Sequence, residues 1–395
     1  MESKSEEAER INLTGSGVGG KEIRIVNREK RSEPVLSVVD ILLSIFVVTP
    51  LVVASWRGLW GLMDFYGFYF PPFSIFVVGI TIHVILALCQ DTLHDAIIES
   101  EKHWTLKLVS HFLRRFYTYI FLIITIFHWR GGWMILDYYT NVQYTDDGVT
   151  KKENSQWILL ICTGCFITLA CMKGLRNATA PPYGICLDKG NFVFKFPTMF
   201  KFNAQTNTML YLLDCLFSVA VVGNLVIFFW RGLWVVTDII ILPDNFIQSS
   251  WASLVLGLLL VGLVYRLQAC MKKLCTSLKG FAKLFIADFY ILLSIVSTLL
   301  FWRGVWNLLI IYFLPDNPLW SCILSHFIGL TFLLVLGCSN SMLVRGVYKD
   351  GKEPNGECVV FPCHYLRILF EEEYSYNDSS SESSVTKLYT EVETA

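Results

Sequence analysis

Four copies of a five-residue motif, Trp-Arg-Gly-x-Trp, hold the residues of this chain best suited to chemistry. Tryptophan favours a membrane–water interface, where its ring is buried and its N–H stays hydrated. Arginine beside it can stack on an indole ring and still bind phosphate or carboxylate. Glycine at the next position allows another helix to approach closely. The copies are Trp56-Arg57-Gly58-Leu59-Trp60, Trp129-Arg130-Gly131-Gly132-Trp133, Trp230-Arg231-Gly232-Leu233-Trp234 and Trp302-Arg303-Gly304-Val305-Trp306.

An aspartate follows the motif arginine by seven residues in three of the four copies. These acids are Asp64, Asp137 and Asp238, and the fourth copy has Ile310 at the same position. Seven residues make about two helical turns, so the arginine and the acid of one copy lie on about the same side of a helix. We therefore expect a local partner for three arginines, whereas Arg303 needs one from a neighbouring unit.

Three interpretations of the motif follow from these residue types. The first is an interfacial anchor that also packs neighbouring helices through Arg–Asp pairs. The second is a ring of four arginines around an outer vestibule, which would favour anions or an anionic lipid headgroup. The third is a docking surface for a partner protein.

The elements that position the motif are predicted to be transmembrane helices. The chain is 54% hydrophobic and 16% charged, with a mean hydropathy of +0.51, whereas soluble domains carry about a quarter charged residues. A bilayer core of about 30 Å requires roughly 20 helical residues. Eight spans fit, and we expect an all-α polytopic membrane protein. Their apolar segments are 35–56, 73–90, 116–129 (continuing into 134–139), 157–172, 210–230, 251–265, 285–302 and 319–343.

The spacing of the motif predicts an internal duplication. The first tryptophans are 73, 101 and 72 residues apart, which indicates two halves of two similar units. Each unit is then a helical hairpin, and the four hairpins have the same orientation. This is a parallel repeat about an axis along the membrane normal. The expected divisions are an N-terminal tail (1–34), a first four-helix half (35–175), a cytoplasmic linker (176–209), a second four-helix half (210–345) and an acidic, serine-rich C-terminal tail (346–395).

The distribution of Lys and Arg predicts the orientation of the spans. The two tails carry 26 of the 32 basic residues together with those connections between spans that lie on the same side of the membrane as the tails. Positive charge is concentrated on the cytoplasmic side of membrane proteins. Both termini are therefore expected in the cytoplasm, and the four motifs on the outer side of the membrane, which we expect to be the plasma membrane.

The sequence favours a non-enzymatic protein. It contains no nucleophile–base pair, metalloprotease helix or glycine-rich active-site loop in the expected context. We therefore expect no catalytic residue, cofactor, metal site or nucleic-acid partner, and the lipid bilayer is the only surrounding that the composition predicts. His83 and His326 lie inside expected spans, where we expect each to bond a neighbouring backbone carbonyl.

The predicted spans, the cytoplasmic ends and the recurrent motif resemble the fuseless family of invertebrate multi-pass membrane proteins. The resemblance covers roughly residues 35–370. It implies a presynaptic protein that organises the active zone and its voltage-gated calcium channels for synaptic transmission. The family has no established catalytic residues to transfer to this chain.

A transporter or channel with an arginine-ringed outer vestibule is the alternative to such an organiser. The two differ in what fills the centre of the helix assembly. A transport pathway requires a continuous polar track, whereas a dry, apolar centre favours an organiser. Polar residues are sparse along the spans, which favours the organiser.

Overall fold

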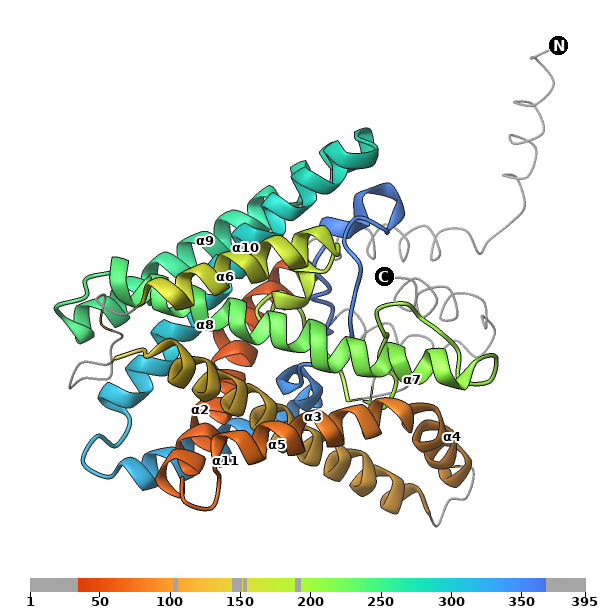
Figure 1. Ribbon diagram of the computed structural model, residues 1–395, viewed down its shortest axis with the longest axis horizontal. Helices are drawn as coiled ribbons and strands as arrows, with labels where there is room; N and C mark the ends of the chain where they lie inside the picture. Colours follow the sequence, from red (N-terminus) through yellow and green to blue (C-terminus); the bar gives the residue numbers. More distant parts are fainter. Residues whose placement is uncertain (1–34, 102–105, 144–150, 152–154, 189–192, 367–395) are drawn as a thin grey trace, which may run out of the picture.

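The computed structural model describes residues 35–101, 106–143, 151, 155–188 and 193–366, and the findings below concern these residues. Within them the chain is all-helical and contains no strand (Figure 1). The expected N-terminal tail, 1–34, and the serine-rich end of the expected C-terminal tail, 367–395, lie outside the described residues.

Six described helices are long and apolar enough to cross a membrane: Val35–Phe65, Lys107–Thr140, Thr208–Ile240, Phe246–Ser277, Gly280–Tyr312 and Pro318–Leu336. A seventh span results if the pair Pro72–Leu88 and Gln90–Ser100, bent by 58°, is counted as one. The apolar helix Gln156–Cys171 has 16 residues. This gives about 24 Å of helix at 1.5 Å per residue, compared with a bilayer core of about 30 Å. Eight spans therefore remain a prediction.

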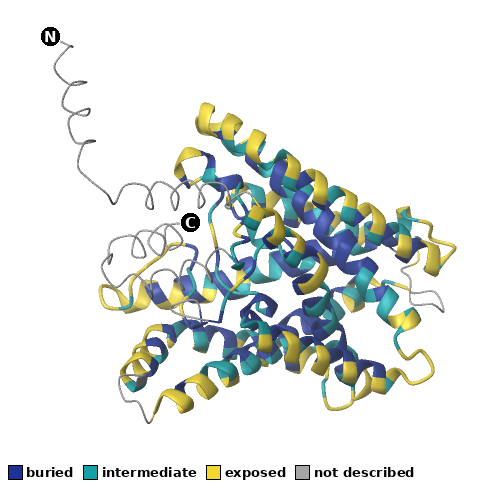
Figure 2. Ribbon diagram, turned by 180° about the vertical axis from the view of Figure 1, so that it is seen from behind, coloured by how far each residue is buried: buried dark blue, intermediate teal, exposed yellow. Residues whose placement is uncertain are grey.

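The motif copies lie on four helices that meet at the centre of the molecule (Figure 1). They are α2 (Thr49–Phe65), α5 (Lys107–Thr140), α8 (Gly223–Ile240) and α10 (Gly280–Tyr312). Four further helices pack around them: α3 (Pro72–Leu88), α6 (Gln156–Cys171), α9 (Phe246–Ser277) and α11 (Pro318–Leu336). Exposed residues gather on the outer faces and ends of the helices (Figure 2).

Each outer helix packs most closely against the next motif helix along the chain, and not against the one before it. Thus α3 packs on α5, α6 on α8, and α9 on α10. The last outer helix, α11, packs on α2 and so joins the two ends of the helical region. The two helices of each expected hairpin are consecutive in the sequence. Each outer helix nevertheless packs more closely against a motif helix of another hairpin. The motif glycines explain this choice, as described below.

Two short 3-10 turns carry the chain back into the interior after α6 and α11. They are η4 (Leu175–Ala178) and η7 (Ser339–Met342), and both contribute buried residues to the main hydrophobic core. The remaining short elements are η2 (Ser44–Val48), α4 (Gln90–Glu101), α7 (Thr208–Leu216), η6 (Phe217–Val222) and η8 (Pro354–Val359).

An aspartate from the opposite half of the chain caps each of these turns. The Asp350 carboxylate accepts hydrogen bonds from the backbone N–H groups of Leu175 and Arg176, at 2.6 and 3.1 Å. The Asp188 carboxylate accepts from those of Ser339 and Asn340, at 2.9 and 2.7 Å. The segments after the two halves are therefore packed crosswise. The start of the expected C-terminal tail belongs to the folded structure.

Candidate functional site

The eight motif tryptophans form two closed rings across the four central helices. In the first ring, neighbouring indole centroids are 5.5 to 5.8 Å apart. In the second, they are 5.6 to 6.3 Å apart. All eight contacts are edge-to-face. The first ring is Trp56, Trp129, Trp230 and Trp302, and the second is Trp60, Trp133, Trp234 and Trp306.

Edge-to-face packing suits indole rings, because the positive edge of one ring meets the negative face of the next. Such pairs contribute about 0.5–1.5 kcal/mol each beyond the area that they bury. The first ring is buried and the second partly buried. Together the rings fill the centre between the four motif helices with aromatic side chains.

Three tryptophans of the first ring also bond to the two turns that enter the interior and to the segment just after η4. The indole N–H groups of Trp56, Trp230 and Trp302 donate to the carbonyls of Met342, Ala178 and Pro181, each at 2.8 Å. These bonds satisfy buried donors that would otherwise be costly in an apolar centre. The two turns therefore close the centre beneath the first ring.

The arginines pair across copies, which corrects the expected pairing within a copy. The Nε atoms of Arg130, Arg231 and Arg303 lie 2.8, 2.6 and 2.9 Å from Oδ1 of the aspartate in the preceding copy. Those acids are Asp64, Asp137 and Asp238. The prediction was wrong because two helical turns separate the acid from its own arginine by about 10 Å along the helix axis. An adjacent helix places the next arginine beside the acid.

Because each arginine pairs with the aspartate of the preceding copy, the arginine without an acid is not the one that we expected. Arg303, which was expected to need a distant partner, has Asp238. Arg57 in the first copy has no carboxylate partner among the described residues. Its Nη1 atom instead donates to Oγ of Ser321 and Ser325, at 2.8 and 3.3 Å, and to the Ser321 carbonyl at 3.3 Å.

The serine pair on α11 has an equivalent on α9 that sequence reasoning missed. Arg303 donates from Nη1 to Oγ of Ser253 at 2.6 Å and from Nη2 to Oγ of Ser249 at 2.9 Å. A repeated spacing could have revealed both pairs, because each serine pair follows a Leu-Pro-Asp-Asn sequence at the same distance. The signal was the repetition and not the residue type.

Each motif glycine lies against the outer helix that packs on its own helix. A Cβ atom built on Gly58 would lie 2.4 Å from the Cys322 carbonyl oxygen of α11. On Gly232 it would lie 2.1 Å from Cys162 Cβ of α6. The corresponding distances are 2.7 Å for Gly131, to Phe76 of α3, and 2.6 Å for Gly304, to Leu254 of α9. Glycine therefore permits the close helix pairs described above, and the motif positions α2, α5, α8 and α10 against both kinds of neighbour.

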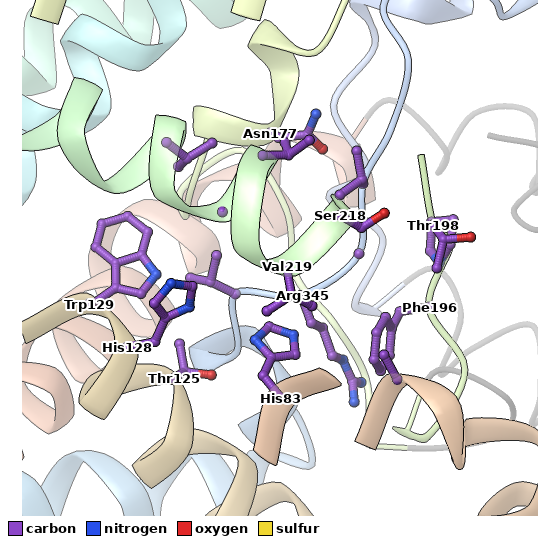
Figure 3. A pocket seen from close by; sticks show the side chains of 18 residues that line it. His83, Thr125, His128, Trp129, Asn177, Phe196, Thr198, Ser218, Val219 and Arg345 are labelled. Atoms are coloured by element: carbon purple, nitrogen blue, oxygen red, sulfur yellow. The ribbon is translucent and has the colours of Figure 1, made fainter. Parts of the chain in front are cut away.

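A small cavity lies to one side of the centre, between α3, α5 and the η6–α8 helix. Its volume is about 50 Å³, and His83, His128 and Arg345 are among the residues that line it (Figure 3). His128 Nε2 lies 2.8 Å from Asn224 Oδ1, whereas the buried His83 Nδ1 has no partner among the described residues. A water molecule needs about 10–15 Å³ of such space, so this cavity has room for a few waters.

His83 and His326, the two histidines expected to bond a backbone carbonyl, differ from each other. His326 Nδ1 lies 3.0 Å from the Ser55 carbonyl oxygen, as expected for a lone buried histidine. His83 instead packs edge-on against Phe121, with ring centroids 4.9 Å apart. Neither imidazole is part of a metal-ligand group of three or more side chains in the described part of the chain.

The geometry described above is that of a multi-pass helical protein organised by its repeated motif. Searches of the curated proteins and of the solved structures found no match to this chain. A family model does match, over residues 35–343, and this region contains all four motif copies. Because the match covers well over half of the chain, this multi-pass membrane protein belongs to the Fuseless family.

Proposed function

We propose that this protein is a non-enzymatic organiser of the presynaptic membrane, which localises voltage-gated calcium channels and active-zone proteins for synaptic transmission. The synaptic role is the one that the family resemblance implies. The observation that supports an organiser over a transporter is the filled centre. Two indole rings, together with the two turns that contribute buried residues to the core, occupy the place where a transport pathway would run.

The motif arginines also favour this reading over an anion vestibule. Their exposed fractions are 0 to 6%, and each guanidinium group donates to groups of its own chain. A selectivity ring would direct such groups toward a water-filled path. The motif is better suited to lock neighbouring helices together at the outer interface.

The proposal includes eight spans, arranged as four parallel repeats in two halves, with both termini in the cytoplasm. Two features of the described residues support the two halves. A π-helical segment leads directly into α2 and into α8, at nearly the same distance before the motif; the segments are η2 (Ser44–Val48) and η6 (Phe217–Val222). In addition, an aspartate caps an equivalent turn after each half, with Asp350 at η4 and Asp188 at η7. The short helix Gln156–Cys171 would cross by local thinning of the bilayer.

Calcium-channel staining at synapses tests the role directly. A tagged copy should localise to presynaptic terminals, and a null background should show dispersed channels. Reintroducing the wild-type chain should restore the clusters, whereas a Gly232→Leu variant, which cannot pack α8 on α6, should not. A matched Gly164→Leu variant, at a position with open space around it, should restore them. Normal channel clustering without the protein would overturn the proposal.

Flux measurements on proteoliposomes test the alternative. With the centre filled, vesicles containing the purified full chain should be no more permeable to small ions and anions than empty vesicles. Saturable flux that exceeds that of empty vesicles would establish the transporter or channel instead.

A further inference from the structure

Three of the four corners between neighbouring motif helices contain the same ion pair. In each, an arginine Nε lies 2.6 to 2.9 Å from an aspartate Oδ1 of the preceding copy. The arginines of these pairs are almost fully buried, at 0 to 2% of their side-chain surface. Each corner therefore contains a cation whose charge is balanced by a carboxylate at a fixed position.

The fourth corner, between α10, α11 and α2, contains the cation without the carboxylate. The tryptophan contacts place α10 beside α2, with Trp302–Trp56 and Trp306–Trp60 centroids 5.8 and 5.9 Å apart. Going around the ring, the acid for Arg57 would come from α10. The residue at the acid position of that helix is Ile310.

The Arg57 side chain is nevertheless buried and anchored at one end. It is 6% exposed, and Nη1 is anchored by Ser321 and Ser325 of α11. No described residue accepts a hydrogen bond from Nε or Nη2 of Arg57. Neither nitrogen belongs to the fully buried side-chain atoms that have no hydrogen-bond partner. The Nε–Nη2 edge is therefore without a partner among the described residues and is not completely sealed from the surface at this corner.

A buried guanidinium without a counter-charge is costly in a membrane protein. Its planar Nε–Nη2 edge matches the two oxygens of a carboxylate, which it binds in a bidentate manner. The three equivalent corners use a carboxylate at the same Nε atom. The three equivalent corners therefore indicate that the ligand of Arg57 is also a carboxylate.

We propose that the corner between α10, α11 and α2 is a binding site for a carboxylate group supplied from outside the chain, with Arg57 as its recognition residue. The carboxylate completes the fourth ion pair. Its source is either a lipid headgroup or a carboxylate from the aqueous side. The proposal concerns the ligand of Arg57 and is independent of the synaptic role.

Thermal unfolding of the full chain in phosphatidylcholine nanodiscs tests this site. Sodium acetate, compared with sodium chloride at equal ionic strength and pH 7.5, should raise the Tm of the wild-type protein by about 2 °C. Ile310→Asp provides the missing acid within the chain. It should raise the Tm without acetate and abolish the acetate effect. Ile310→Asn, a matched neutral variant, should keep the acetate effect.

Nanodisc composition identifies the source. Phosphatidylserine, which carries a carboxylate, should reproduce the stabilisation if the lipid is the ligand, and Ile310→Asp should remove it. A response to acetate without a response to phosphatidylserine assigns the site to an aqueous carboxylate. The assignment fails if chloride or phosphatidylglycerol, which has phosphate but no carboxylate, stabilises the protein equally. It also fails if acetate leaves the Tm of the wild-type protein unchanged. The same holds if the Ile310→Asp and Ile310→Asn variants have the same Tm in the absence of acetate.

Discussion

At the scale of single residues, the same ion pair occurs in different surroundings. The side chain of Asp64 is 51% exposed, whereas Asp238 is 5% exposed. Water reaches the Asp64 carboxylate and screens its pair with the buried Arg130 in part. A buried pair gains more, but breaking it leaves a charge in an apolar environment. The copies of one motif should therefore differ in energetic weight although their geometry is the same.

Neutralising the two acids should reveal this difference. Asp238→Asn should lower the free energy of unfolding by about 3–5 kcal/mol, because Arg303 would be buried without a counter-charge. Asp64→Asn should cost less than Asp238→Asn, because water at the half-exposed Asp64 position can replace part of the interaction with the buried Arg130. Denaturant unfolding in mixed micelles measures both variants, with the half-exposed Asp64 as the comparison. Equal losses would show that burial does not determine the strength of these pairs.

At the scale of helices, close approach decides which pairs form. The motif glycines let α3, α6, α9 and α11 contact the backbones of the next motif helices. Contact of this kind drives association where lipid removes the hydrophobic drive between helices. The short turns η4 and η7 depend on caps from remote aspartates, and so add an electrostatic element to the packing.

Alanine substitutions should separate packing glycines from ordinary ones. Gly232→Ala places a Cβ 2.1 Å from Cys162 Cβ, and should cost about 1–3 kcal/mol or more through overpacking. Gly262→Ala on α9 meets nothing within 4 Å. It should be neutral or slightly stabilising, because alanine favours helix more than glycine does. Thermal unfolding compares the two, and an equal response would remove the packing role of the motif glycine.

The Asp350 cap should make stability depend on pH. Burial, followed by the charge of Asp288, raises the pKa of the Asp350 carboxyl to about 7. Below its unfolded value near 3.8 the group is protonated in both states, so its effect is constant. Between pH 4 and 7 the unfolded chain releases the proton more readily, and stability should fall as pH rises, by at most about 1.4 kcal/mol per unit.

The matched variant for this effect is Asp350→Asn, which retains one capping oxygen but cannot ionise. Its Tm should change less between pH 4 and 7 than that of the wild-type protein, and the two curves should run parallel above about pH 7.5. If the Tm of the wild-type protein rises more between pH 4 and 7 than the Tm of the variant does, the predicted direction of the pH effect is wrong.

At the scale of the whole molecule, the two halves are interlocked. The first half contains α6, whose packing partner α8 is in the second half, and the second half contains α11, whose partner α2 is in the first. The caps by Asp188 and Asp350 cross between the halves in both directions. Neither half can therefore satisfy its own packing surfaces.

Cutting the chain between α6 and α7 should test this interlock. Fragments 1–205 and 206–395, expressed together, should copurify as a folded complex, because all pairwise contacts can form. Each fragment expressed alone should aggregate or be degraded, since its motif helices lack partners. Gel filtration and trypsin resistance distinguish these outcomes. A monodisperse, protease-resistant single fragment would show that the halves fold independently.

The sequence by itself determined the helical class, the membrane setting, the fourfold motif and its family, because apolar length and repetition are local properties of the chain. It also identified Trp, Arg, Gly and Asp as the residues that matter. Only the tertiary structure decided which copy each residue contacts. Asp64 and Arg57 are neighbours in sequence, yet Asp64 pairs with Arg130, because helical rise separates residues two turns apart while an adjacent helix comes within hydrogen-bonding distance. The same shift around the ring moved the arginine without an acid from Arg303 to Arg57, and no local pattern contains that information.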